Sequence, residues 1–424
     1  MQPSEAIADR YPLWTRAALA TCLLLVNAGA SFAQLPSEPV TLFDGRLVMS
    51  GELRFTIAPL DEGYFNASDY NHNLLRLLTI GLLAEGRVSD RISVLANVED
   101  RTAVGRLEGG GDRHVLLPYA LFVRIRPWTD LALDIDAGRI PRVFGAFATG
   151  DYAASNPLIG RPLAYHYLLA LRDDALPGST TDLFSNQGRG WRVRYPIGDA
   201  RPGAGVPVVA STRLDTGVQM RWRSRWLDMR AALTRGTLSH PLARDNNDGN
   251  QLAGRVAVMP TPALILGLSA ARGTFVDDAA IESLPAEIRQ ETFAQRALGL
   301  DAEWSWSRFL FRTETIVSSW DLPAVAAPRI DRPLRALSVM GEGRVKITPR
   351  VYAAARVDGL RFSNVADGAG LFRPWEAEIT RLEVGGGFRL RRNATIKLVY
   401  QHNWRDTPRL DRARFVAMEL SYWF

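Results

Sequence analysis

The sequence contains little cysteine, lysine or histidine. Cys22 is the only cysteine, so the chain can form no internal disulfide and no cluster of thiolates that holds a metal. Only two of the 51 basic residues are lysines, Lys346 and Lys397, so arginine carries nearly all of the positive charge. The five histidines have no convincing Ser or Asp partner on an adjacent segment. We therefore predict that the chain is not an enzyme and needs no metal or cofactor.

Long hydrophobic runs are also missing after the first forty residues. No later stretch is apolar over the eighteen or more positions that a membrane-spanning helix requires. Residues 1–33 have a polar lead, a short apolar run and small residues at Ser31 and Ala33, which predicts a secretory signal peptide cleaved after Ala33. Cys22 precedes most of the apolar run, so we do not expect it to be lipidated. The exported chain, residues 34–424, keeps the net charge of +6.

Alternating apolar and polar positions fill most of the exported chain. Successive segments are joined at one end by turns of a few residues and at the other by longer loops rich in Asp, Asn, Pro and Gly. Hairpins are the economical way to join segments so tightly. The segments are 46–57, 74–86, 91–99, 115–126, 131–141, 211–223, 226–236, 251–259, 263–273, 294–306, 308–319, 334–348, 350–363, 379–391, 394–404 and 414–424.

This pattern predicts an all-β protein: an antiparallel up-and-down transmembrane barrel, in which backbone groups pair and no edge remains. The count is sixteen strands if residues 142–210 form one long external loop. A count of eighteen strands is also possible, because "GWRVRYPI" (190–197) and "GVPVVAST" (205–212) resemble another hairpin. A count of fourteen is a further alternative. Short turns on one side and long loops on the other are typical of outer-membrane barrels.

The two faces of each segment differ in polarity. In 294–306, Leu298 and Leu300 alternate with Gly299 and Asp301, so one face suits lipid and the other water. Tryptophans lie at the ends of the segments, and we predict that they form interfacial girdles. They are Trp128, Trp222, Trp226 and Trp306 at short turns, and Trp320 and Trp404 at long loops.

The chain ends on an alternating segment, "RFVAMELSYWF", with no polar tail. Phe424, Tyr422 and Leu420 fall on its apolar face. This ending resembles the C-terminal signal that the outer-membrane assembly machinery recognises in bacterial outer-membrane porins. Within porins, "DAGRIPRVFGAF" (136–147) is similar to a Gly-x-x-x-Pro-x-x-Gly stretch of the phosphate- and polyphosphate-selective family. The resemblance implies sixteen-stranded homotrimers in outer-membrane lipid, with ladders of basic residues in the channel, although here the inward positions mix both signs.

Charged residues occupy the inward positions and are the candidates for lining a pore. Opposite charges on neighbouring strands would also brace the wall as cross-strand pairs. With a net charge of +6, we expect a mild preference for anions. The candidates are Arg54, Arg76, Arg124, Arg221, Arg223, Arg312, Glu314, Arg344, Lys346, Arg381, Glu383 and Lys397.

The long loop at 142–210 carries more apolar residues than a solvated loop would. Leucine, isoleucine and tyrosine cluster between 158 and 171, and this surface must be buried somewhere. One hypothesis is a constriction loop or partial plug inside the barrel, and the other is a lid or a contact with a neighbouring subunit. The candidates for meeting the channel are Arg161, Tyr165, His166, Arg172, Asp173 and Asp174.

Together these patterns predict a passive outer-membrane channel for small hydrophilic solutes. The alternative is a plugged barrel, or one that serves as a structural or adhesion scaffold without transport. Nucleic acid is not an expected partner, because the arginines are spread over both ends and the interior. The path of water past residues 150–190 distinguishes the channel from the plugged barrel. A continuous path favours transport, and an occluded one favours the plugged barrel or scaffold.

Overall fold

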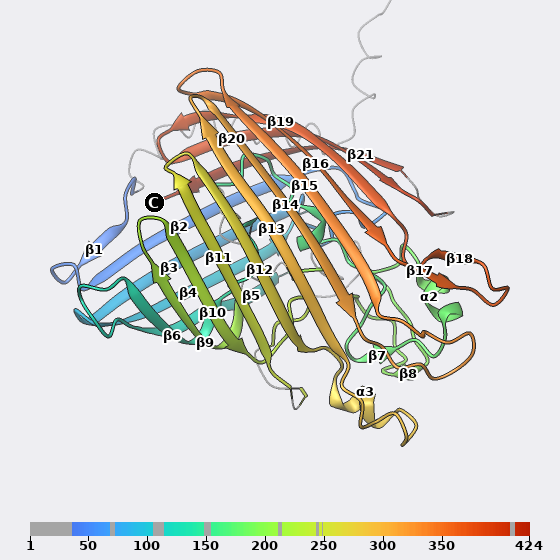
Figure 1. Cartoon of the computed structure of the whole chain (residues 1–424). Coiled ribbons are helices and arrows are strands. Elements are labelled where there is room, and N and C mark those ends of the chain that lie inside the picture. The colour runs from blue at the N-terminus through green and yellow to red at the C-terminus, as the bar shows by residue number, and fades with distance from the viewer. Residues whose placement is uncertain are drawn as a thin grey trace, which may run out of the picture.

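The computed structural model describes residues 36–67, 73–104, 114–147, 154–210, 214–242, 246–247, 249–407 and 412–424. The predicted signal peptide lies outside these residues. Figure 1 shows a barrel of long tilted strands, with short turns at the end where the chain terminates and longer loops at the other end.

Sixteen antiparallel strands form one continuous wall. They are β2 (Leu47–Ile57), β3 (Leu77–Ser89), β4 (Ile92–Ala103), β5 (His114–Ile125), β6 (Leu133–Pro141), β9 (Leu214–Arg223), β10 (Leu227–Thr234), β11 (Gln251–Thr261), β12 (Leu264–Thr274), β13 (Ala294–Trp306), β14 (Phe309–Trp320), β15 (Leu334–Lys346), β16 (Val351–Phe362), β19 (Ile379–Arg391), β20 (Ala394–Arg405) and β21 (Arg412–Trp423). The prediction of a sixteen-stranded all-β barrel is confirmed.

The alternative of eighteen strands is wrong. In the region that suggested an extra hairpin, β8 (Ile197–Gly198) pairs with β7 (Ala175–Leu176) in a small sheet separate from the wall. Residues 206–210 belong to no strand. The alternating pattern there arises from packing within the long loop, which has its own apolar core. Fourteen strands are likewise excluded, because β6 pairs directly with β9 and every neighbouring pair is accounted for.

The barrel closes between its first and last long strands. Glu52 of β2 lies opposite Trp423 of β21, and the pairing continues to Ile57 and Met418. The Phe424 amide donates to the Gly51 carbonyl at 3.0 Å, and the Gly51 amide donates to the Phe424 carbonyl at 3.1 Å. A short strand, β1 (Val40–Leu42), continues along the start of β2. The last residue of the chain is therefore part of the closing seam.

Polarity separates the two faces of the wall, as the alternation predicts. Leu298 and Leu300 of β13 are each 61% exposed on the outer face, whereas Asp301 beside them is buried on the inner face. Trp128, Trp226 and Trp306 are exposed at the short-turn end. With water absent from a bilayer core, such an apolar outer face suits contact with lipid.

Trp320 is a correction to the predicted girdle. It has the same parity as the buried Ser318, so it points inward and is fully buried. Its ring meets Trp375 edge-on with centroids 6.3 Å apart, and its Nε1 donates to Ser239 Oγ at 3.2 Å. Loop residues cover this end of the barrel and give the indole a core environment.

The smaller elements lie at the long-loop end in Figure 1. They are the 3₁₀-helix η4 (Leu163–Tyr165), α2 (Thr180–Asn186), α3 (Asp278–Glu282), and the hairpin of β17 (Asn364–Ala366) and β18 (Phe372–Pro374). In the described part of the chain, no helix is long and apolar enough to cross a membrane.

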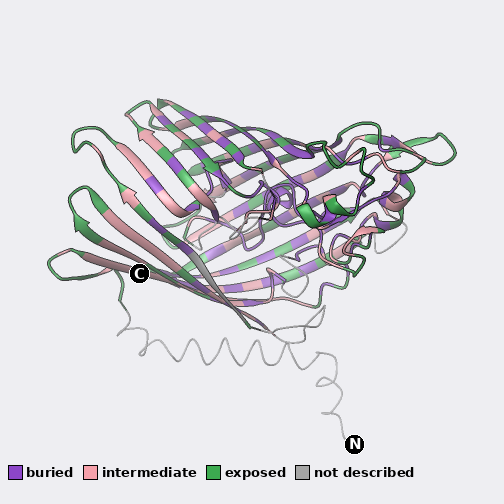
Figure 2. Ribbon diagram, turned by 90° about the horizontal axis from the view of Figure 1, so that it is seen from below, coloured by how far each residue is buried: buried purple, intermediate pink, exposed green. Residues whose placement is uncertain are grey.

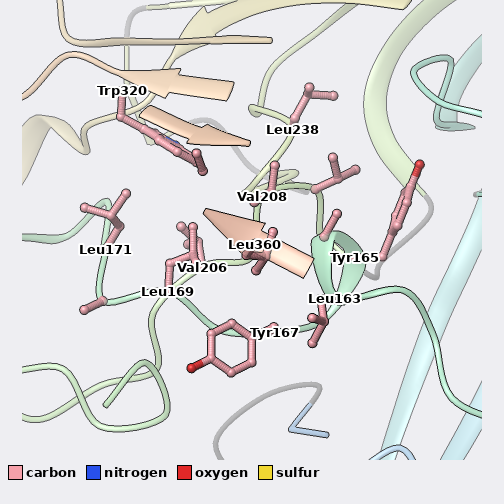
Figure 3. Close-up of a cluster of buried hydrophobic side chains, with 14 of the residues drawn as sticks. Leu163, Tyr165, Tyr167, Leu169, Leu171, Val206, Val208, Leu238, Trp320 and Leu360 are labelled. Atoms are coloured by element: carbon pink, nitrogen blue, oxygen red, sulfur yellow. The ribbon is translucent and has the colours of Figure 1, made fainter. Parts of the chain in front are cut away.

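The main hydrophobic core lies inside the barrel and under its loops (Figure 3). Leu163, Leu169 and Leu171 of the long loop pack in one cluster with Leu360 and Trp320 of the wall. A barrel of this strand number is otherwise wide enough to hold an aqueous channel. The long loop fills part of that space, and its contacts with the wall define the candidate site.

Candidate channel and its constriction tract

Residues 154–210, called the tract below, follow a turn of the chain that leaves β6 and enters the barrel. Gly145 makes that turn with a φ of +80°, a conformation that glycine adopts without strain. Its amide donates to Ser269 Oγ at 3.1 Å, and the Ala146 amide donates to Glu314 Oε1 at 2.8 Å. A Cβ on Gly145 would lie 2.4 Å from the Tyr165 hydroxyl. The segment "DAGRIPRVFGAF" (136–147) therefore includes the turn into the lumen.

The tract is held against β16 by Arg356, which is fully buried. The Arg356 guanidinium donates to the Gly160 carbonyl at 2.8 Å and to Asn156 Oδ1 at 3.0 Å. The same guanidinium pairs with Glu342 on β15 at 2.7 Å. One side chain thus connects the wall to two residues of the tract through charge-assisted bonds.

β19 and β20 supply further anchors. The Gly160 amide donates to Glu383 Oε1 at 2.8 Å. Lys397 pairs with Glu419 of β21 at 2.9 Å and donates to the carbonyls of Asn156 and Leu158 at 3.0 and 3.3 Å. Two of the pore-lining candidates, Glu383 and Lys397, therefore contact the tract and are nearly inaccessible to solvent.

Tyr165 bonds the tract to β14, two strands from β16 in the wall. Its hydroxyl donates to Glu314 Oε2 at 2.7 Å, and Figure 3 places its ring beyond η4 from the leucine cluster. Burial, together with the Glu314 carboxylate, raises the pKa of Tyr165 well above its usual value. The phenol stays neutral and acts as a donor, so Glu314 is bound by the tract.

His166 and Arg161 meet β19 through Arg381. The Arg381 guanidinium lies 3.0 Å from His166 Nε2 and donates to the Arg161 carbonyl at 3.3 Å. Nδ1 of His166 lies 3.0 Å from the Pro162 carbonyl, which fits a neutral ring with the proton on Nδ1. Burial and the adjacent Arg381 hold the pKa of His166 well below its usual value. Arg161, Tyr165 and His166 thus lie where the tract contacts the inner wall.

Arg172, Asp173 and Asp174 lie later in the tract, after the residues that contact β19. Arg172 pairs with Asp174 at 2.8 Å and donates to the carbonyls of Val193 and Arg201. Asp173 pairs with Nδ1 of His240, in the loop after β10, at 2.7 Å. These three candidates brace the tract internally and against a neighbouring loop.

Several pore-lining candidates are paired with acids on the inner wall. The pairs are Arg54 with Glu52 at 2.8 Å, Arg124 with Asp136 at 2.8 Å, Arg221 and Arg223 with Asp228 at 3.3 and 2.9 Å, and Arg312 with Glu303 at 2.7 Å. Such pairs brace the wall. Arg76 lies just before β3, where its amide donates to the Asn73 carbonyl at 3.0 Å.

A second group of inward cations lies near the short turns. Arg344 and Lys346 on β15 and Arg389 on β19 have no acidic side chain within salt-bridge distance among the described residues. Lys346 and Arg389 are exposed to solvent. These three cations therefore add positive charge to the short-turn end of the inner wall.

The long-loop half of the lumen is filled instead. Each of the sixteen strands carries at least one inward side chain that is 9% exposed or less, such as Thr56, Arg101, Asp136, Glu314 and Arg381. Figure 2 shows the buried residues as purple bands along the strands. Between the tract and β2–β4 there is a small cavity of about 20 Å³, lined in part by Arg54, Arg101, Arg161 and Glu419.

The sequence candidates included the anchors Glu383 and Lys397 but not Arg356, Asn156 or Gly160. Arg356 lies opposite both Glu342 and Glu383 in the sheet register, so a charge pattern across three strands could have identified it. Asn156 and Gly160 gave no such signal, because their roles depend on where the tract lies. Among the described residues, no group of His, Cys, Asp and Glu is arranged to hold a metal ion.

No protein-family model matches the sequence, and no curated protein matches it. Solved structures match most of the chain. OmpF of Salmonella typhi, in complex with daunomycin, is 11% identical with a TM-score of 0.52, over 89% of this chain and 97% of that one. OmpT, an outer membrane protein of Vibrio cholerae, is 11% identical with a TM-score of 0.51 as its loop L8 deletion mutant, over 89% and 99%. At such identity the likeness shows the fold alone, which is the sixteen-stranded porin barrel.

Proposed function

We propose that the protein is a passive outer-membrane channel for small hydrophilic solutes, narrowed by the tract. The observation that carries this proposal is a closed barrel with an apolar outer face, a charged inner face and an irregular segment bonded across its lumen. Irregular backbone at membrane depth is tolerated where it is enclosed by protein and lines an aqueous space. The porin fold of the similar structures supports the same class of function. This function requires no cofactor and no covalent chemistry.

We infer a mild preference for anions from the inward cations at the short-turn end. Arg344, Lys346 and Arg389 have no described acid within salt-bridge distance, whereas several other inward arginines are paired with one. A charged lumen with low-dielectric walls concentrates counter-ions. The similarity of residues 136–147 to phosphate- and polyphosphate-selective porins agrees with this direction, and competition of phosphate with chloride current would test it.

A plugged barrel is the second candidate, and burial of the inner wall favours it. Arg356, Arg381 and Glu383 are fully buried, and the small cavity beside Arg161 is about the size of one water molecule. In this case the barrel would serve as a scaffold, or would conduct only when the tract leaves the wall.

The proposed setting is the outer membrane of a Gram-negative cell, with short turns facing the periplasm and long loops facing outward. The seam at Phe424, with Tyr422 and Leu420 on the same face, supports recognition by the assembly machinery. A homotrimer in the membrane, as the porin resemblance implies, would be tested by the mass of the detergent-solubilised complex.

Planar-bilayer recording in a KCl gradient tests the channel proposal. We expect discrete conductance steps and a reversal potential that indicates anion selectivity. Replacing Arg344 and Arg389 by glutamine should move the reversal potential toward cations, whereas Arg225→Gln, at an exposed turn, should not. Cation selectivity of the unmodified protein would overturn the preference, and a protein that inserts without conducting would favour the plugged barrel.

A further inference from the structure

The outer wall carries a groove of about 1060 Å³ over β10 to β15, toward the long-loop end. Its floor is a row of small residues on adjacent strands, because Ala231 lies opposite Gly254 and Gly254 lies opposite Ala270. Leu252, Leu298 and other large apolar side chains border this row. The outer face is therefore hollowed where three neighbouring strands lack side chains of any size.

A row of basic side chains lies directly above the floor of the groove. Arg272 on β12 is opposite Arg296 on β13, Arg296 is opposite Ser319 on β14, and Ser319 is opposite Arg335 on β15. All three arginines are exposed. Like charges placed directly opposite each other destabilise a sheet unless an anion lies between them.

Little in the protein neutralises this row. Arg296 pairs with Asp321 at 2.8 Å. In the described part of the chain, no acidic side chain lies within salt-bridge distance of Arg272 or Arg335, and none lines the groove. The row therefore presents at least two guanidinium groups to an external anion.

The position of the row along the strands fits a lipid headgroup. On β13, Arg296 and Trp306 lie ten positions apart, with Leu298, Leu300 and Trp304 facing outward between them. A transmembrane strand needs roughly 9–11 residues to cross the hydrocarbon layer. The tryptophan end thus marks one interface, and the arginine row marks the other.

We propose that this groove binds a membrane lipid with a phosphate headgroup, whose phosphate is held by Arg272, Arg296 and Arg335. Its acyl chains lie along the floor formed by Ala231, Gly254 and Ala270. Arginine suits this role because its planar fork donates two parallel bonds to phosphate oxygens. The inference rests on the proposed membrane location of the barrel, but it is independent of conduction. A second copy of the chain in a two-fold contact is a poorer occupant, because it would place this row of arginines against itself.

Native mass spectrometry of the full-length protein in detergent tests the proposal. The probes are phosphatidylglycerol, phosphatidylcholine with the same acyl chains, and inorganic phosphate. We expect phosphatidylglycerol to remain bound, and the triple variant Arg272→Gln, Arg296→Gln, Arg335→Gln to bind it roughly 100-fold more weakly, since each basic residue near an anionic headgroup contributes about a fivefold factor.

A matched control triple, Arg225→Gln, Arg308→Gln, Arg350→Gln, removes the same charge from exposed short turns and should bind as the unmodified protein does. Ala270→Leu keeps the arginines, fills the floor and should weaken binding about fivefold. Conductance of the first triple variant, recorded separately, should equal that of the unmodified protein. The lipid site and the channel are therefore tested independently, and the failure of one can be told from the failure of the other.

Three results would overturn the lipid site. Equal binding of phosphatidylglycerol by both triples would remove the role of the arginines. Full displacement of the lipid by millimolar inorganic phosphate would assign the row to a free anion. Loss of an oligomer in the first triple without a change in lipid binding would assign the groove to contacts between copies.

Discussion

Replacing Arg356 by glutamine is expected to release the tract from the wall. The guanidinium makes two bonds to the tract, at 2.8 Å to the Gly160 carbonyl and at 3.0 Å to Asn156 Oδ1. Hydrogen bonds to charged groups contribute about 1.5–3 kcal/mol each, so docking should weaken by roughly 3–6 kcal/mol. The ratio of undocked to docked protein should rise at least about 100-fold.

Limited trypsin digestion in detergent measures this change. Arg172 is 4% exposed, so cleavage after it requires the tract to open. When opening is fast, the cleavage rate follows the open population, and it should rise by the same factor. Arg230→Gln is the control, because Arg230 faces inward and pairs with Asp228. If Arg356→Gln is cleaved after Arg172 no faster than the control, and conducts no better, the reasoning is refuted.

Three further predictions concern the turn into the lumen, the seam and pH. Gly145→Ala should lower the thermal midpoint of unfolding, at a cost of about 2 kcal/mol or more, because φ is +80° and the new Cβ would meet the Tyr165 hydroxyl; Gly341→Ala, with open space around it, should not. Deleting Phe424 should reduce the yield of folded barrel, measured by gel mobility without heating, whereas Phe43→Ala at an exposed site of the same end should leave it intact. Because the pKa of His166 is depressed in the docked state, docking loses stability as pH falls below about 6.5, where only the released ring takes up a proton. Conductance should therefore rise between pH 7.5 and 5, less so in His166→Gln, and an identical rise in both would contradict this role.

Alternation was sufficient to predict the wall, because side chains in a strand repeat every two residues and a lipid-facing strand must be apolar on one side. Most predicted segments begin and end within three residues of the observed strands. Strand ends were less predictable: Trp320 was expected in the interfacial girdle, and the loops that cover it could not be predicted from its spacing. Near β3, the predicted start at 74 was early, since residues up to Arg76 turn before Leu77 begins the strand.

The contacts of the tract could not be predicted from spacing. Its apolar composition indicated burial, but Tyr165 meets Glu314 across 149 positions of sequence, and His166 meets Arg381 across 215. Such pairs depend on where an irregular segment crosses a lumen, and an irregular segment has no periodicity to fix that path. Arg172 likewise was selected as a channel residue, whereas its bonds are within the tract.

Single-channel recording of the full-length protein beside a variant in which a short Gly-Ser linker replaces residues 154–206 tests the central claim most directly. The account predicts that the full-length protein conducts through a narrowed lumen and that the variant conducts several times more, because the tract occupies the long-loop half of the barrel. Equal conductance in the two proteins would contradict it, since the tract would then not lie in the conducting path.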